Sequence, residues 1–221
     1  MKKLITLSIL LSLFGLSSVF AQTPAVGDSY QGGIVAYIFQ PGDPGYMAGQ
    51  TRGLIAAPSD QSSGIRWNNG TNILTGASGT GLGTGKANTD AIVATQGAGS
   101  YAAKLCDDLV LGGYDDWYLP SFPELQQLFI HKDVIGGFIS PSNYWASSEW
   151  HVGNNNAFVV GFPYGGLTIS TKDHTFRVRA VRTFTVLSSS VPTLSQWGMI
   201  IFTVLLLAVG TVYVRRRQLN A

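Results

Sequence analysis

The stretch Ser121-Phe122-Pro123-Glu124 contains the clearest local structural signal in the chain. Its serine and glutamate stand at capping-box spacing, and its proline falls in the first helical turn, where a missing N–H costs nothing. Leu125, Leu128 and Phe129 follow at the spacing of one buried helical stripe. We therefore expect a helix that begins after Ser121 and ends near His131.

Short apolar and aromatic segments on both sides of this helix are typical of β-strands, because turn residues separate them. The expected strands cover residues 34–39, 53–57, 144–148, 157–162, 167–170 and 176–184. In the last strand, period-two alternation predicts that Val178 and Ala180 point inward and that Arg177 and Arg179 point outward. Trp117 and Trp145 lie inside packed strand motifs, so we expect both in the core.

A second helix is expected from Thr89 to Leu111, with an interruption at Gly97-Ala98-Gly99 where the glycine pair makes continuous helix costly. Cys106 falls on its buried stripe and is the only cysteine, so no internal disulfide can form. The order of strands, helices and strands favours an α+β domain with mainly antiparallel short strands and two helices.

Both ends of the chain carry targeting signals. Lys2 and Lys3, an apolar stretch and Val19-Phe20-Ala21 are typical of a signal peptide that signal peptidase cuts after Ala21. Near the other end, the uncharged run from Trp197 to Val214 would span about 27 Å as a helix, close to the hydrocarbon thickness of a bilayer. Arg215, Arg216 and Arg217 follow and should stay on the cytoplasmic side.

These signals predict five segments: a signal peptide at 1–21, a folded domain at 22–186, a linker with a sorting motif at 187–196, a transmembrane helix at 197–214 and a basic tail at 215–221. The formal net charge of +2 comes from the two ends. Five of the 14 Lys and Arg residues lie in the two ends. The other nine and all 12 acidic residues lie within residues 22–190, so this region carries a net charge of −3. Nucleic acid is therefore not an expected partner.

The motifs of the central region resemble the Lcl C-terminal domain family, also called DUF1566, over nearly all of the exported part. The resemblance implies a C-type lectin-like fold and a role in binding glycans at the cell surface. It is carried by Gly53-Leu54-Ile55-Ala56-Ala57-Pro58, Asn88-Thr89, Ala103-Lys104-Leu105-Cys106, Gly113-Tyr114-Asp115-Asp116-Trp117-Tyr118-Leu119-Pro120-Ser121, Tyr144-Trp145-Ala146-Ser147-Ser148-Glu149 and Arg177-Val178-Arg179-Ala180-Val181-Arg182.

The tail resembles the IPTL-CTERM sorting signal of Gram-negative bacteria. Its elements are Val191, Pro192, Thr193 and Leu194, with Trp197 and Gly198 at the start of the apolar run and the arginine cluster behind it. The resemblance implies an envelope or surface location and an exosortase-like membrane protease that reads the motif and removes the helix. The alternative is a simple stop-transfer anchor with an incidental proline.

Lectin-like sites combine carboxylate and amide oxygens with the face of a tryptophan. Two groups offer these side chains: Trp67, Asn68 and Asn69, and the expected loop with Glu149, Trp150, His151 and Asn154. We expect a ligand there, and the loop that contains Trp150 and His151 is the first choice for its surface. No calcium-lectin motif is present, and the three histidines lack metal-ligand spacing, so we expect no metal and no cofactor. Calcium stays open as an alternative that no motif supports.

No catalytic motif supports an enzyme. The glycine-rich segment 79–86 has Thr80 and Ala87 where a phosphate-binding loop needs glycine and a hydroxyl residue. We therefore expect an exported, non-enzymatic binding module for carbohydrate or another cell-surface partner. Two alternatives stay open: an envelope-associated enzyme that uses carboxylates such as Asp116 and Glu149, and a purely structural surface or biofilm-matrix protein.

Overall fold

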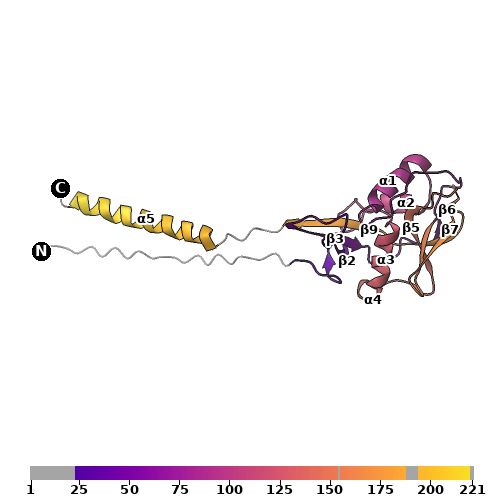
Figure 1. Ribbon diagram of the computed structural model, residues 1–221, viewed down its shortest axis with the longest axis horizontal. Helices are drawn as coiled ribbons and strands as arrows, with labels where there is room; N and C mark the ends of the chain where they lie inside the picture. The colour runs from indigo at the N-terminus through magenta and orange to yellow at the C-terminus, as the bar shows by residue number, and fades with distance from the viewer. Residues whose placement is uncertain (1–22, 154, 188–193, 220–221) are drawn as a thin grey trace.

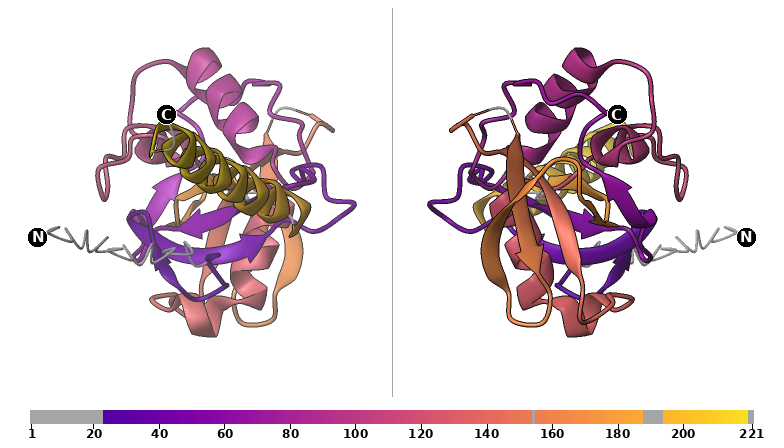
Figure 2. Two further views of the ribbon diagram at one scale, coloured as in Figure 1. Left: turned by 90° about the vertical axis from the view of Figure 1, so that its left-hand side faces the viewer. Right: turned by 90° about the vertical axis from the view of Figure 1, so that its right-hand side faces the viewer.

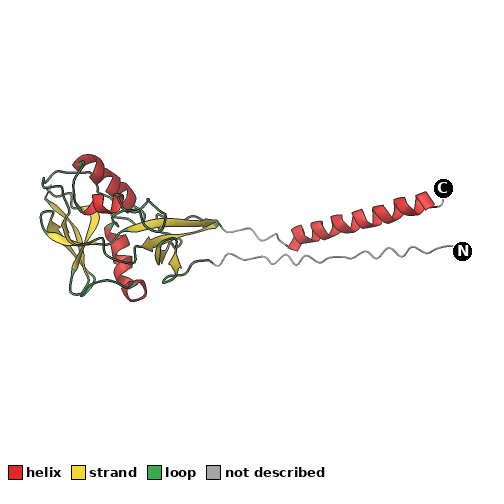
Figure 3. Cartoon of the chain, turned by 180° about the vertical axis from the view of Figure 1, so that it is seen from behind, coloured by secondary structure: helices red, strands yellow, loops and turns green. Residues whose placement is uncertain are grey.

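The computed structural model describes residues 23–153, 155–187 and 194–219. In these ranges the chain forms an α+β domain with two sheets, followed by a separate C-terminal helix (Figures 1 and 3). The α+β class expected from the sequence is confirmed. The expected signal peptide at 1–21 with its expected cleavage residue Ala21, the sorting residues Val191, Pro192 and Thr193, and Asn154 lie outside the described residues.

The first sheet is entirely antiparallel and lies at the end of the domain where the chain enters and leaves (Figure 1). Its strands, in spatial order, are β1 (Ser29–Tyr30), β2 (Gly33–Ile38), β3 (Gln50–Ala56) and β9 (Val181–Leu187). Gln31 and Gly32 form the turn between β1 and β2 with φ of 46° and 87°, the left-handed pair that a two-residue hairpin requires.

The second sheet occupies the other end of the domain (Figure 2, right). Its strands, in spatial order, are β4 (Ser62–Arg66), β8 (Thr175–Val178), β5 (Asn143–Glu149), β6 (Asn156–Gly161) and β7 (Gly166–Thr171). Among these strands, only the β5 and β8 pair is parallel, so the expected antiparallel arrangement holds. The sequence did not predict β4, whose polar residues Ser62, Ser63 and Gly64 hide its strand character.

Four short helices, not the expected two, lie in the domain: α1 (Gly85–Gln96), α2 (Ala102–Asp107), α3 (Phe122–Ile130) and α4 (Lys132–Ile135). The interruption at Gly97 is confirmed, but α1 begins earlier and α2 ends earlier than expected. The capping box of α3 is present, since the Glu124 side chain accepts from Ser121 N at 2.7 Å. Burial raises the pKa of the Glu124 carboxyl, although backbone N–H donors oppose that shift.

Two clusters of buried residues form the core. The first contains Trp67, Trp117, Trp145 and Cys106 between the sheets and helices α1 and α2, and the second packs α3 against β5 and β6. The core positions expected for Trp117, Trp145 and Cys106 are confirmed. Burial raises the pKa of the Cys106 thiol, which therefore stays protonated and unreactive near neutral pH.

The expected single strand at 176–184 is wrong. The chain passes from β8 in the second sheet to β9 in the first, and Arg179 and Ala180 make the crossing. Arg179, expected to point outward, is fully buried. Its guanidinium donates to Asp60 Oδ1 and to the carbonyl oxygens of Ala57, Gly136 and Gly137. Period-two alternation fails here because the strand ends before Arg179.

Helix α5 (Leu194–Leu219) contains the expected membrane segment. Residues Trp197–Leu219 are long and apolar enough to cross a membrane, and none of that window is buried against the domain. The helix begins before the predicted 197–214 segment and continues through Arg215, Arg216 and Arg217 of the predicted tail. The basic cluster therefore extends the helix instead of following it.

Candidate functional site

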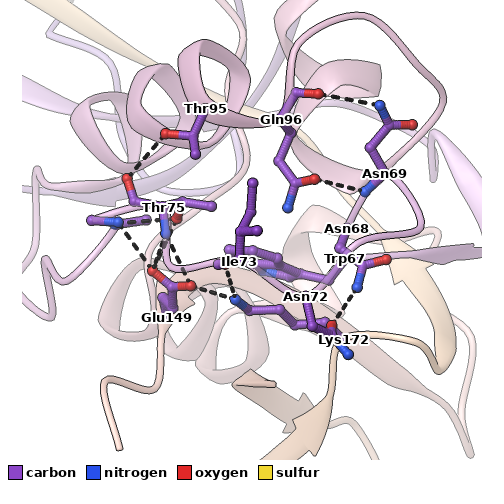
Figure 4. A network of polar contacts seen from close by, with 12 residues as sticks. Trp67, Asn68, Asn69, Asn72, Ile73, Thr75, Thr95, Gln96, Glu149 and Lys172 are labelled. Atoms are coloured by element: carbon purple, nitrogen blue, oxygen red, sulfur yellow. Dashed lines mark hydrogen bonds and ion pairs between the residues drawn. The ribbon is translucent and has the colours of Figure 1, made fainter. Parts of the chain in front are cut away.

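Glu149, expected as an exposed ligand-binding residue, is only 3% exposed at the end of β5. Its carboxylate accepts hydrogen bonds from Thr75 N at 2.9 Å, Thr75 Oγ1 at 3.0 Å and Gly76 N at 3.1 Å. The other carboxylate oxygen is paired with the Lys172 ammonium (Figure 4). Glu149 therefore fastens one loop to another and does not face solvent.

Lys172 is fully buried beside Glu149, and sequence reasoning missed it. Its Nζ donates to Ile73 O at 2.9 Å and lies 4.6 Å from the centre of the Trp67 ring, a cation–π arrangement. Trp67 is fully buried, and its indole N–H donates to Ala146 O at 2.8 Å. The expectation that Trp67 presents a face to a ligand is therefore wrong, because Lys172 and the core cover it.

The two expected asparagines also hold the chain in place (Figure 4). Asn68 is 1% exposed and donates to Asn72 Oδ1 at 2.6 Å and to Asp173 Oδ1 at 3.1 Å. Asn69 is exposed, but its side chain donates to Ala98 O at 2.7 Å, beyond the end of α1. These amides fix the segment that follows Trp67.

The buried contacts bring two loops together. Glu149 N donates to Ala77 O at 2.8 Å, which places the segment after Trp67 beside the loop that joins β5 to β6. We use the term two-loop surface for the outer residues where these segments meet: Gly76, Ser78, Trp150, His151 and Val152. Gly76, Ser78, His151 and Val152 are exposed, and Trp150 is half-buried.

Trp150 has an aromatic support on its inner side. Its ring lies edge-on to Phe158 at 5.5 Å between centroids, and Phe158 in turn stacks on Phe122 of α3 at 5.6 Å. The His151 ring lies 5.5 Å from Trp150 at an angle of 32°. The sequence placed Trp150 and His151 correctly in a loop, and the structure adds the ring packing that fixes the indole.

The two-loop surface can offer an aromatic face, the Ser78 hydroxyl and backbone groups to a ligand. In the described part of the chain, no cluster of three or more His, Cys, Asp or Glu side chains could hold a metal ion. The carboxylates considered for an enzyme lie in separate ion pairs. Glu149 is paired with Lys172, and Asp116 binds Arg182 through both oxygens at 2.6 and 2.9 Å.

The architecture is that of an α+β domain with a loop-borne aromatic surface and a membrane-type helix at its C-terminal end. Residues 57–182 match the sequence model of the Lcl C-terminal domain, and the chain belongs to this family. Residues 189–218 match the IPTL-CTERM motif. Both relationships expected from the sequence are confirmed. No curated protein matches the chain.

The sorting motif and the apolar helix together indicate an exported protein that is sorted to the surface and anchored through its C-terminal segment. The motif also implies processing by a sorting system.

Proposed function

We propose that the domain is a C-type lectin-like module that is displayed at the cell surface and binds carbohydrate through the two-loop surface. The observation that carries this proposal is the buried Glu149–Lys172 pair, which joins the end of β5, next to Trp150 in the chain, to the segment that follows Trp67. A binding residue on a loop that is held by buried contacts loses little conformational freedom when a ligand binds.

The chemistry of the surface suits a neutral sugar. Tryptophan offers a flat apolar face to sugar C–H groups, while hydroxyl and backbone groups pair with sugar hydroxyls. Trp150 and Ser78 provide both kinds of contact without a charged Lys, Arg, Asp or Glu in the two-loop surface. We infer a non-enzymatic role with no metal or cofactor, because Asp116 and Glu149 are each held by a cation. The alternatives are an enzyme and a purely structural matrix protein. The following measurement separates the binding module from both.

Replacing Trp150 with alanine should weaken glycan binding at least tenfold, because the largest apolar contact of the surface is removed. A glycan array with the full chain identifies the ligand, and calorimetry then measures the affinity of each variant. Tyr164→Ala is the matched control, since Tyr164 is 93% exposed on the turn between β6 and β7. It should bind as tightly as the unchanged chain.

A second substitution in the two-loop surface shows whether a loss of binding can be explained by misfolding. Val152 is 64% exposed, so Val152→Asp should leave the melting temperature unchanged and still weaken binding through the altered surface. Failure of the unchanged chain to bind any glycan would contradict the carbohydrate proposal, and equal loss in Trp150→Ala and Tyr164→Ala would contradict the assignment of the surface.

We propose further that the chain is made with a cleaved signal peptide, is delivered to the envelope of a Gram-negative bacterium, and is processed at its tail by an exosortase-like protease. Support comes from the IPTL-CTERM match and from the apolar run of α5, which is followed by three arginines. After processing, the folded domain would no longer carry α5.

Replacing Pro192 with alanine should block this processing, because the protease would lose part of its recognition element. Mass spectrometry of the protein from its own cells should find α5 removed from the unchanged chain and retained in the Pro192→Ala chain. Thr185→Ala, an exposed change in β9, serves as the control and should be processed normally. An intact C-terminus in the unchanged chain would leave only the simple membrane anchor.

A further inference from the structure

Strand β7 is an open edge of the second sheet. All of its residues except Ser170 are exposed, including Leu167 at 49% and Ile169 at 43%. The strand contains no charged residue and no proline, and it pairs with β6 in six regular steps without a bulge. Such an edge readily pairs with another strand, and proteins usually protect against that.

The other sheet edges of the domain carry the usual protection. Strand β1 has only two residues, and β4 has an irregular register between Ser62 and Ile65 and ends in Arg66. Strand β9 is covered at its start, where Val181 and Tyr118 exchange two backbone hydrogen bonds. Among the described strands, β7 alone presents a long, regular and uncharged edge.

The ladder with β6 determines which backbone groups of β7 face outward. Lys172 N donates to Asn155 O at 2.7 Å, one step beyond the pair of Thr171 and Asn156. Because hydrogen-bonded and non-hydrogen-bonded pairs alternate in an antiparallel ladder, Gly166, Thr168 and Ser170 direct their backbone groups to β6. Leu167 and Ile169 direct theirs away from the sheet, while Thr171 O accepts from His174 N at 3.1 Å in the turn that follows.

We propose that β7 pairs with β7 of a second copy of this chain, antiparallel, with Thr168 opposite Thr168 on the two-fold axis. In this register Leu167 of each copy lies opposite Ile169 of the other. Cross-strand neighbours share a face, so the apolar Leu167 and Ile169 meet each other and the Thr168 side chains of the two copies meet on the axis. With no charge on the strand, nothing repels the second copy.

The position of β7 in the domain also fits a second copy. Leu167 and Ile169 lie on the same face as their partners Val160 and Phe158, which belong to the core. A second β7 would continue this face and cover its open flank. The strand lies at the far end of the domain from Leu187, where the chain departs toward α5 (Figure 1). Two anchored copies can therefore meet there, and a pair of weak glycan sites would bind a surface more tightly than one.

A single cysteine tests the register. Opposed residues of a non-hydrogen-bonded antiparallel pair have Cα atoms about 4.5 Å apart, within reach of a disulfide. Thr168→Cys in the full chain, kept in detergent micelles and mildly oxidised, should give a disulfide-linked dimer on a non-reducing gel. Thr171→Cys is the matched control, because each Thr171 would face position 165 of the other copy, so this variant should form no disulfide and run as a single chain on the same gel. Cys106 is buried and does not interfere.

A second measurement does not depend on cysteine chemistry. Light scattering should give the mass of two chains for the unchanged protein in micelles and of one chain for Ile169→Lys, which would put two ammonium groups into the shared edge. Thr185→Lys, at an exposed position of β9, should remain dimeric. Ile169→Lys should keep its circular dichroism and its glycan affinity per site, which separates this proposal from the binding proposal. A monomeric unchanged chain, or equal cross-linking of Thr168→Cys and Thr171→Cys, would overturn it.

Discussion

Replacing Lys172 with methionine should lower the free energy of unfolding by about 3–5 kcal/mol, measured by urea denaturation at neutral pH. The large effect arises because Glu149 would stay buried without its cation, and Ile73 O would lose its donor. Methionine keeps most of the side-chain volume, so the loss reports the charge and not a cavity. The stacking of the ammonium on Trp67 would disappear as well.

The matched control for this substitution is Lys86→Met. Lys86 is paired with Asp90 on the surface of α1, and the two side chains are 47% and 54% exposed. Exposed pairs contribute at most about 1 kcal/mol, so the control should be close to the unchanged chain. A difference of less than about 1 kcal/mol between the two variants would contradict the anchoring role of the Glu149–Lys172 pair.

Replacing Arg179 with methionine should also lower the free energy of unfolding by about 3–5 kcal/mol. Its guanidinium is fully buried, donates to three carbonyl oxygens and Asp60, and covers the Phe138 ring at 4.1 Å. All four acceptors would lose a donor at once. Thermal unfolding followed by circular dichroism would record the change together with the urea measurement.

Arg177→Met is the closest comparison, because Arg177 binds the same carboxylate at 3.1 Å but has a side chain that is 23% exposed. Solvent can replace much of that contact, so the expected loss is about 1 kcal/mol. Equal losses for the two arginines would mean that Asp60 alone accounts for the effect and that the carbonyl contacts of Arg179 contribute nothing.

Features that depend on neighbouring residues could be predicted from the sequence. The capping box at Ser121, the break between α1 and α2 at Gly97, and the buried position of Cys106 each follow from residues within one or two helical turns. Family motifs extended this local information to the α+β class and to the sorting tail.

Features that depend on long-range pairing could not be predicted. Glu149 and Lys172 meet only because β6 and β7 lie between them and return the chain to the same place. A carboxylate beside tryptophan and histidine therefore suggested an exposed ligand site, although its partners come from elsewhere in the chain. The prediction that Arg179 points outward was wrong for the same reason, because no local residue pattern marks the point where the chain changes sheet.

The pairing of β9 with β3 determines how the domain responds to mechanical load. When the domain is pulled away from its anchored C-terminal segment, the load enters at Leu187, the last residue of β9. Seven antiparallel pairs, from Gln50 with Leu187 to Ala56 with Val181, join the two strands. Their hydrogen bonds run across the strands, so tension along β9 strains them together in shear instead of unzipping them in turn. The anchored segment is therefore attached to a strand whose pairing resists extension.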